Sequence, residues 1–357
     1  MVAWLARGLA AFAQVWHSKH GWALVFALAL AGAWYGLAGR SAAPTQRLQC
    51  TLPVQHSAAP HPGMVWVPGG SFEFGDTVYP EELPLRQTRV SGFWMDRTEV
   101  SNDEFAAFVA ATGYLTDAER PVDAARHPGL TAEQRKPGAV VFVMPKAVTG
   151  AGAPDSWWRY LSGADWRHPG GPGSSIAGHG SFPVVAVTIA DAQAYARWRG
   201  HSLPSEAQWE WAARAGQARA AQDHDQPPQA NTWQGLFPMV NSGEDGFVGL
   251  APVGCYAANA LGLFDMIGNA WELTADAYLP HHRHAAAEPA LPDQAPAGLR
   301  QGAQRVIKGG SFLCAPNYCA RYRSGSRQPQ DDDLGASHLG FRTVLNAAGP
   351  APGPAKP

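Results

Sequence analysis

Two cysteines stand close together in a chain that has few thiols. Cys314 and Cys319 follow the segment Gly309-Gly310-Ser311, and the 357-residue chain has four cysteines in all. Thiolates are the soft ligands that select Cu(I) or zinc, and they are also redox nucleophiles. The spacing alone favours a short-loop disulfide. A metal-binding or catalytic pair and two unrelated thiols remain open as alternatives.

The composition is typical of a globular protein rich in loops. Hydrophobic residues make up 46% of the chain and charged residues 16%, with a net charge of −2. These values provide enough apolar side chains for a core and give no indication of nucleic-acid binding. Glycine and proline number 39 and 30, and there are 14 tryptophans. We therefore expect many turns, aromatic core packing and few long helices or strands.

The N-terminal residues have a different character from the rest of the chain. Residues 21–37 are uncharged and apolar, and they are just long enough to span a bilayer. We expect a cytoplasmic segment at 1–20 and an uncleaved transmembrane signal anchor at 21–38, because the basic residues Arg7 and Lys19 come before the apolar stretch. A cleaved signal peptide and a buried helix are the alternatives. The anchor would hold the main domain outside the cytoplasm, in the periplasm or the extracellular space, where Cys50 and Cys255 could form a disulfide.

The remaining organisation follows from turn and capping signals. Residues 39–62 read as a linker and residues 347–357 as a disordered tail, which leaves a domain at 63–346. Residues 64–75 predict a β-hairpin, and 93–96 a further strand. Three short helices are expected, two with capping boxes at their starts, at 101–113, 188–200 and 205–216. The pattern predicts an α+β domain rather than a Rossmann fold or a barrel.

Several motifs together resemble the formylglycine-generating enzymes, also called sulfatase-modifying factors. The similar segments are 63–108, 165–169, 203–210, 268–272, 308–322 and 339–342. The pair of cysteines after Gly-Gly-Ser is the most specific of them, because relatives with other tasks generally lack it. The resemblance implies a variation of the C-type lectin fold with little regular secondary structure. It also implies oxidation, by O2, of a cysteine in a Cys-x-Pro-x-Arg segment of an unfolded sulfatase-type polypeptide to Cα-formylglycine.

The resemblance also assigns roles to individual residues. Cys314 and Cys319 would be active-site thiols that hold Cu(I) as a bis-thiolate, and Cu(I) accepts such low coordination, which leaves a position for a substrate sulfur. Ser311 matches an active-site serine, with a turn residue as the alternative. Trp157 and Trp158 match an aromatic pair that borders the substrate groove, with core packing as the alternative.

Two structural calcium sites are implied as well. The first consists of Asn231, Thr232, Asp245 and Phe247, and the second of Asp265, Gly268, Ala270 and Glu272. Hard calcium prefers cages of oxygen ligands, and a glycine inside the second segment allows the loop to curl with its carbonyls inward. Without the resemblance, both segments would be ordinary polar loops.

Three classes of function remain open. The first is a membrane-anchored, copper-dependent oxidase. The second is a non-oxidase module on the same scaffold that binds or matures another exported protein, and the third is a structural protein in which the cysteines form only a disulfide. The setting of the pair favours the oxidase, with the disulfide as its metal-free resting form. The acidic run 331–333 is expected to be a solvated surface turn.

Overall fold

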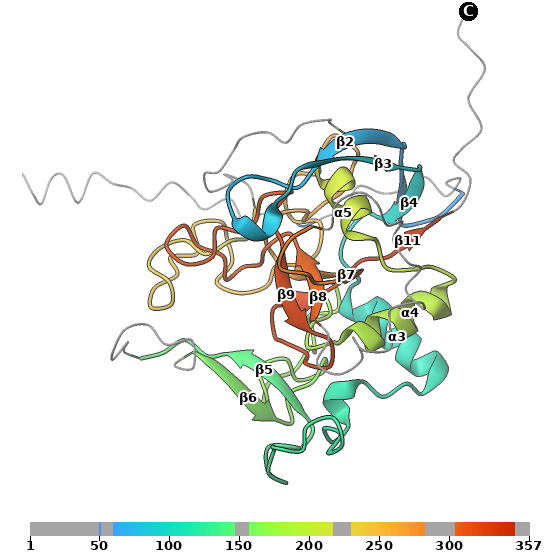
Figure 1. The fold of residues 1–357 in the computed structure, drawn as a ribbon. Helices are drawn as coiled ribbons and strands as arrows, with labels where there is room; N and C mark the ends of the chain where they lie inside the picture. The colour runs from blue at the N-terminus through green and yellow to red at the C-terminus, as the bar shows by residue number, and fades with distance from the viewer. Residues whose placement is uncertain (1–49, 51–59, 147–156, 217–229, 283–303, 347–357) are drawn as a thin grey trace, which may run out of the picture. The chain divides into compact units, whose positions relative to one another are not determined.

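A computed structural model describes residues 50, 60–146, 157–216, 230–282 and 304–346 (Figure 1). All of them belong to the second of two compact units, residues 48–357. The segments predicted at 1–20 and 21–38, most of the linker at 39–62 and the tail at 347–357 lie outside the described residues. Within the part that is described, no helix is both long and apolar enough to cross a membrane.

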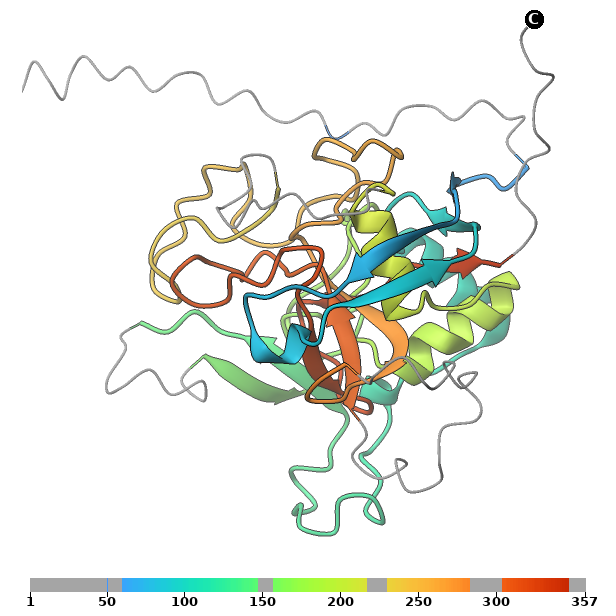
Figure 2. The same cartoon turned by 45° about the horizontal axis from the view of Figure 1, so that its top comes forward.

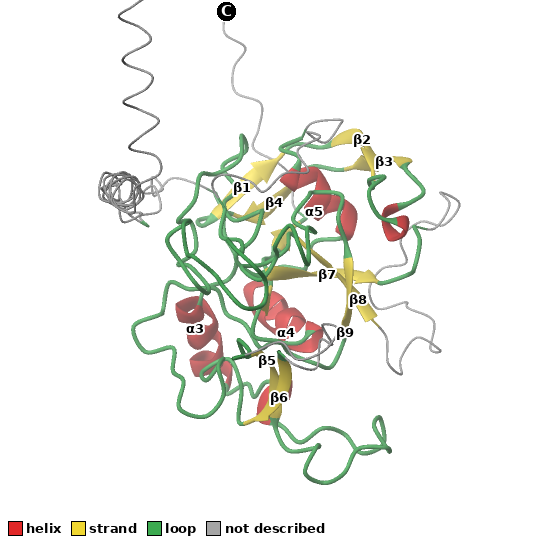
Figure 3. Cartoon of the chain, turned by 90° about the vertical axis from the view of Figure 1, so that its left-hand side faces the viewer, coloured by secondary structure: helices red, strands yellow, loops and turns green. Residues whose placement is uncertain are grey.

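Short strands form small sheets. The largest contains, in spatial order, β10 (Leu339–Gly340), β7 (Trp271–Ala277), β8 (Gln304–Lys308) and β9 (Gln328–Asp331). A second sheet joins β1 (Met64–Val67), β4 (Phe93–Asp96) and β11 (Val344–Leu345). Two pairs complete the set: β2 (Gly70–Phe74) with β3 (Arg86–Val90), and β5 (Gly138–Phe142) with β6 (Trp158–Ser162). Figure 3 shows long loops between these strands, as the sequence predicted.

The helices begin where the capping signals place them. The Ser101 side chain accepts a hydrogen bond from the Glu104 N–H at the start of α3 (Asn102–Thr112), and a left-handed Gly113 ends the helix. Helix α4 (Ile189–Arg199) lies between caps at 188 and 200 in the same way. Helix α5 (Glu206–Ala213) is shorter than predicted, because Arg214 already leaves helical geometry. Two 3₁₀ turns, η1 (Pro80–Glu82) and η2 (Asp117–Glu119), add to the loops.

The predicted hairpin at residues 64–75 is wrong. Strands β1 and β2 follow each other in sequence, but β1 pairs with β4 and β2 pairs with β3. The link between them runs close against another segment, since a Cβ on Gly69 would lie 2.7 Å from the Gly92 nitrogen and 2.8 Å from the Val90 oxygen. The Pro-Gly-Gly sequence therefore carries the chain from one sheet to the other and does not turn it back.

Helices cover different faces of the strands. Helix α5 contacts the β2–β3 pair as well as β7 and β8 (Figure 1). Helix α4 contacts both α3 and β7, and in Figure 2 the strands β8 and β9 lie between α4 and the β5–β6 pair. The segment after β8, which carries the two cysteines, thus starts at the centre of the domain.

Buried ion pairs join these elements. The Lys308 Nζ at the end of β8 lies 3.1 Å from Glu210 Oε2 and 3.7 Å from Glu206 Oε1, both on α5. The Arg327 Nε lies 2.8 Å from Glu206 Oε1. Burial, the largest single effect, would raise the pKa of Glu206, but a hydrogen bond from His282 and the charges of Lys308 and Arg327 together lower it to about 2.

We expect Glu206→Gln to lower the free energy of unfolding by about 3–5 kcal/mol, because it leaves buried cations without their counter-charge. Since the pKa of Glu206 is lower in the folded state, the stabilisation is full above about pH 4.5 and is lost as the pH falls towards 2. Urea unfolding at several pH values measures both effects. The control is Glu133→Gln, which breaks the exposed pair with Lys136 and should cost under about 0.5 kcal/mol. Equal losses in the two variants would contradict the prediction.

Candidate active site

Two glycines direct the chain into the site. Gly309 and Gly310 follow β8 with φ angles of 93° and 77°, in the left-handed region that favours glycine. A Cβ on Gly310 would lie 3.3 Å from the Cys314 sulfur and 3.1 Å from Tyr322, and a Cβ on Gly309 would lie 3.0 Å from the Trp209 ring. The Gly-Gly sequence therefore permits a close backbone approach to the thiol. We call residues 309–319 the cysteine turn.

The two thiols lie together and are free. The Cys314 and Cys319 sulfurs are 3.1 Å apart, with Cys314 as the hydrogen-bond donor. An S–S bond is about 2.05 Å long, so the sulfurs are in contact but not joined. Burial raises the pKa of Cys314 well above its ordinary value, whereas the hydrogen bond from Cys314 lowers the pKa of Cys319 against the effect of burial. Cys319, which is half-buried, is thus the first of the two to ionise.

Ser311 shapes the turn that holds these thiols. Its backbone N–H donates to the Cys314 sulfur at 3.4 Å, and its hydroxyl oxygen accepts from the Leu313 N–H at 3.2 Å. Ser311 is fully buried and lines the same cavity as the cysteines. The arrangement brings together the three residues that the sequence nominated for catalysis.

The cysteines open onto a groove of about 270 Å³. Its apolar wall includes Trp158, Trp271 and Ile307, and its polar wall includes the amides of Gln328 and Gln330 from the edge strand β9. Gln328 Oε1 lies 3.9 Å from the Cys319 sulfur, a contact that the sequence did not indicate because the two residues are on separate elements. Such a groove, with an apolar wall and a row of amides, suits an extended polypeptide.

The structure separates the two tryptophans that were predicted to border the groove. Trp158 lines it, and its ring lies 4.6 Å from the ring of His338, whose pKa burial lowers to about 3. Trp157 is almost fully buried and does not line the groove. It packs edge-on against Phe237 and Tyr318, a position that agrees with the core-packing alternative. Its place beside a bound substrate stays a prediction.

The first predicted calcium segment forms a compact loop, residues 231–247, which we call the cation loop. The Asp245 carboxylate accepts from the N–H groups of Thr232 (3.0 Å) and Phe247 (3.1 Å). The Asn231 Oδ1 is buried, and no hydrogen-bond partner is found for it among the described residues. Burial raises the pKa of Asp245. An unsatisfied amide oxygen and a partly desolvated carboxylate in the same loop fit the oxygen-rich ligand set of calcium.

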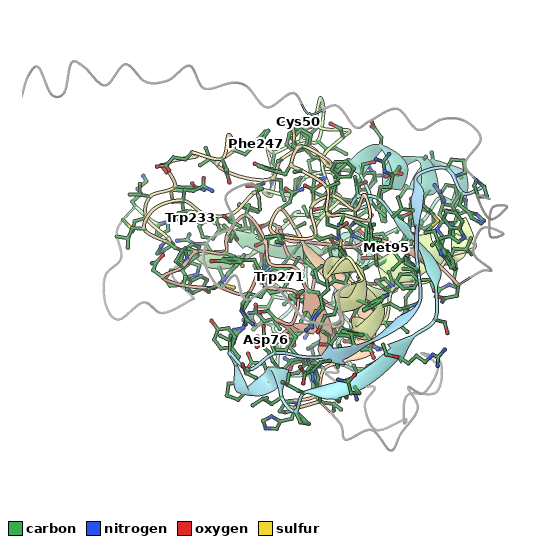
Figure 4. All side chains as sticks on the ribbon, turned by 90° about the horizontal axis from the view of Figure 1, so that it is seen from above. Cys50, Asp76, Met95, Trp233, Phe247 and Trp271 are labelled. Carbon is green, nitrogen blue, oxygen red and sulfur yellow. A yellow bond between two sulfur atoms is a disulfide. The ribbon has the colours of Figure 1, made fainter. Side chains whose placement is uncertain are left out.

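A disulfide anchors this region. Cys50 and Cys255 form the disulfide that the sequence left open (Figure 4). Cys50 and Phe247 of the cation loop both pack against the buried cluster that contains Cys255. The cross-link closes a long stretch of chain, which restricts the unfolded state more than the folded one. It therefore stabilises an edge of the domain that has little sheet.

Glu99, which the sequence analysis missed, lies beside Asp265 of the second predicted calcium segment. The Asp265 and Glu99 carboxyls lie close enough to share a hydrogen bond, and Asp265 Oδ1 and Glu99 Oε2 are buried with no other partner among the described residues. Burial and then the charge of Asp265 raise the pKa of Glu99 well above its ordinary value, and burial raises that of Asp265 to about 6. Glu272 is already held by Arg342 at 2.6 Å and by the Trp209 Nε1 at 2.7 Å. The excess of buried negative charge fits a divalent cation.

Backbone geometry ties the two segments together. Gly268 forms an isolated β-bridge with Asn231, and a Cβ on Gly268 would lie 2.1 Å from the backbone carbonyl oxygen of Asn231. Ala270 is buried directly before β7. Across the described residues, His, Cys, Asp and Glu side chains do not form a ready-made group of three around a metal. A cation in either loop would therefore rely on amide and carbonyl oxygens as well as carboxylates.

Fold and site together define a loop-rich α+β protein with a free dithiol on the wall of an open groove. Residues 49–347 match the family model of the sulfatase-modifying factor enzyme 1-like domain, and the chain belongs to this family. It is 46% identical to the formylglycine-generating enzyme of Mycobacterium tuberculosis, over 79% of this chain and 97% of that protein. The Bos taurus enzyme of the same name is 42% identical, over 81% and 76%.

Other matches limit what family membership implies. A Mus musculus protein named inactive C-alpha-formylglycine-generating enzyme 2 is 35% identical, over 83% of this chain and 90% of that protein. The solved structure of PvdO from Pseudomonas aeruginosa has a TM-score of 0.52 at 23% identity and covers 79% of this chain and 93% of its own. That likeness supports the fold alone. The activity has to be argued from the dithiol and its groove.

Alkylation of the reduced, metal-free protein should label Cys319 before Cys314, because Cys319 is more exposed and has the lower pKa. The rate should rise with a midpoint below the ordinary thiol pKa. Cys314→Ala should move that midpoint upwards, since it removes the hydrogen bond that chiefly stabilises the Cys319 thiolate. Peptide mapping after timed iodoacetamide treatment measures this order, and faster labelling of Cys314 would refute it.

Proposed function

We propose that this protein oxidises a cysteine of a Cys-x-Pro-x-Arg segment, in an unfolded sulfatase-type polypeptide, to Cα-formylglycine, with Cu(I) as cofactor and O2 as oxidant. The observation that carries the proposal is the pair of free thiols 3.1 Å apart on the wall of an open groove. The names of the relatives support it, since formylglycine-generating enzymes match over nearly their whole length.

The chemistry of the donors fits copper. Two thiolates at contact distance suit a soft metal that accepts low coordination, and Cys314 and Cys319 would hold it. The bound copper would supply O2 activation beside a substrate sulfur. The protein would contribute a thiol, Cys319, that ionises early, and a backbone N–H from Ser311 that points at the Cys314 sulfur. Trp158 and Trp271 line the groove and would limit the access of water to the reacting sulfur.

The electron balance defines a further requirement. Conversion of the cysteine CH2SH to an aldehyde releases sulfide and removes two electrons from the substrate, whereas reduction of O2 to water takes four. Two further electrons must come from a reductant, and two small thiols that become a disulfide would supply them. Cys319 lines the groove and is partly exposed, and this gives such thiols a route to the site.

Calcium is proposed as the second cofactor, at the two loops described above. The unpartnered oxygen of Asn231 and the two buried carboxyls of Asp265 and Glu99, which face each other, support this assignment. A cation at Asp265 and Glu99 would remove the cost of burying their charges, so that neither carboxyl would need a proton. Cation binding in such loops contributes directly to folding.

Attachment to a membrane through residues 21–38, with the domain outside the cytoplasm, is also a proposal. The disulfide between Cys50 and Cys255 supports it, because such bonds persist in oxidising compartments. The natural substrate would then be an exported polypeptide met before it folds. Protease protection of spheroplasts carrying the full chain would test the orientation, and a domain digested only after lysis would contradict it.

A peptide containing Cys-x-Pro-x-Arg should lose mass at its cysteine when incubated with the copper-loaded enzyme, O2 and a thiol. Cys314→Ala and Cys319→Ala should each reduce the rate by at least about a thousandfold, because each removes half of the metal site. Mass spectrometry of the peptide, with hydrazide capture of the aldehyde, measures the product. An unchanged melting temperature in each variant serves as the folding control.

The same assay separates the alternative function. A non-oxidase module that binds or matures another exported protein would bind the peptide, or the copper, without forming an aldehyde. The match to a relative named inactive gives this alternative its support. Copper-loaded protein that leaves the peptide unmodified under O2 would favour it over the oxidase.

Two of the three carboxylates in the acidic run at 331–333 form ion pairs, and the third does not. Asp332 lies 2.8 Å from Arg126, and Asp333 lies 2.7 Å from His127. Asp331 accepts from the neutral Gln304 amide at 3.0 Å and is the acidic residue that lines the groove. We propose that it attracts the arginine of the substrate segment.

Asp331→Asn should therefore raise KM for the arginine peptide by about three- to tenfold with little change in kcat, because an exposed ion pair contributes modestly to binding. The effect should vanish for a peptide with glutamine at the arginine position. Asp332→Asn is the matched control and should leave KM unchanged. If the two variants have the same KM, Asp331 does not recognise the arginine.

A further inference from the structure

The cation loop holds the cysteine turn directly. The Trp233 N–H donates to the Cys314 carbonyl at 3.0 Å. The Asn317 amide makes a reciprocal pair with the backbone of Phe237: its Nδ2 donates to the Phe237 oxygen at 3.2 Å, and its Oδ1 accepts from the Phe237 N–H at 3.4 Å. Both ends of the amide have a matching partner, so its orientation is defined by the bonds it makes.

Aromatic contacts add to the hydrogen bonds between the cation loop and the cysteine turn. The Phe237 ring is stacked on Tyr318, with centroids 4.1 Å apart and planes 9° from parallel. Trp157 meets both rings edge-on, at 5.7 and 5.8 Å. Tyr318 directly precedes Cys319, so the position of the more reactive thiol depends on a stack whose other half belongs to the cation loop.

The segment that contacts the cysteine turn is also hydrogen-bonded to the Asp245 carboxylate of the same loop. The Asp245 carboxylate accepts from Gln234 Nε2 at 2.7 Å and from the Thr232 N–H at 3.0 Å, and the Asp245 N–H donates to Gln234 Oε1 at 3.0 Å. Residues 232 and 234 flank Trp233, which bonds to the Cys314 carbonyl. A cation that fixes Asp245 therefore also restrains the segment that bonds to Cys314 and Asn317 of the cysteine turn.

We propose that the cation loop regulates the dithiol: a divalent cation bound there preorganises Cys314 and Cys319 for Cu(I), and Asn317 is the positioning residue that transmits the effect. The inference rests on the proposed function, because Cu(I) and calcium are the two metals that were proposed there. Restricting the turn before copper arrives reduces the entropy lost on binding. By linkage, copper must raise the affinity for calcium by the same factor that calcium raises the affinity for copper.

The test measures Cu(I) affinity rather than turnover. The reduced full chain is titrated under anaerobic conditions against the chromogenic Cu(I) chelator bicinchoninate, once with Ca²⁺ and once with EGTA. We expect calcium to tighten Cu(I) binding by about five- to thirtyfold, the usual size of coupling between two sites. In Asn317→Ala the calcium effect should fall to within about twofold, while calorimetry shows that calcium still binds.

Matched variants complete the design. Asp245→Asn should give the weaker Cu(I) affinity whether or not calcium is present. Asn346→Ala alters an exposed asparagine whose partner, Gln208, is far from the cysteines in sequence, and it should keep the full calcium effect. Phe237→Leu removes the stack but keeps the backbone bonds to Asn317, and it should keep part of the effect. This variant provides a second measurement if Asn317→Ala fails to fold.

Two results would overturn the inference: equal Cu(I) affinity of the wild-type chain with calcium and with EGTA, or a full calcium effect in folded Asn317→Ala. Neither result depends on aldehyde formation, so the oxidase proposal could stand after either. Conversely, normal coupling in a protein that leaves the peptide unmodified would support the inference and count against the oxidase. A chain that binds no Cu(I) at all would end both proposals.

Discussion

The arrangement of the loops depends on the buried pair between Arg342 and Glu272. Arg342 is fully buried and donates to both Glu272 oxygens and to the carbonyls of Asp96, Arg97 and Phe264. One guanidinium thus joins the end of β4, the loop before β7, β7 itself and the segment between β10 and β11. In a domain with small sheets, such a planar donor replaces several ladder hydrogen bonds, and lysine has no equivalent fork. The buried charges are tolerated because nearly every polar atom of the pair has a partner.

Glu272 of that pair is the β7 partner of Lys308, so the pair and the Lys308 network together fix the C-terminal end of β8, where the cysteine turn begins. Lys308 is held by α5, and the next two residues are glycines that pass close to Trp209 and to Cys314. A side chain at either glycine would displace the turn. The turn is closed by its own hydrogen bonds, such as those from the Cys314 and Cys319 N–H groups to the Ser311 and Ala315 carbonyls, and its neighbours fix where it lies. The rigid centre supplies one wall of the groove, and the less regular cation loop supplies the support behind it.

Local signals in the sequence predicted the helices well because capping is a short-range interaction. Ser101 and Ser205 each bond to a residue three positions later, and both helix starts are confirmed. The hairpin at 64–75 was wrong because strand pairing is decided by distant segments, here 86–90 and 93–96. Glu99 was missed for the same reason, because no local sequence signal indicates that it lies close to Asp265 in the fold. The three nominated catalytic residues lie together because all of them fall within residues 311–319, which form one turn.

The two cysteine pairs of this chain are favoured by opposite redox conditions. Cys50 and Cys255 are cross-linked, and such a bond persists where the surroundings are oxidising. Cys314 and Cys319 are in contact yet free, and the same surroundings would favour their oxidation. The burial of Cys314 restricts attack to Cys319, because the thiolate is the reactive form and Cys314 resists ionisation. A soft metal bound to both sulfurs would protect them further. The asymmetry between the two thiols thus suits a site that must stay reduced, or be reduced again, before it can act.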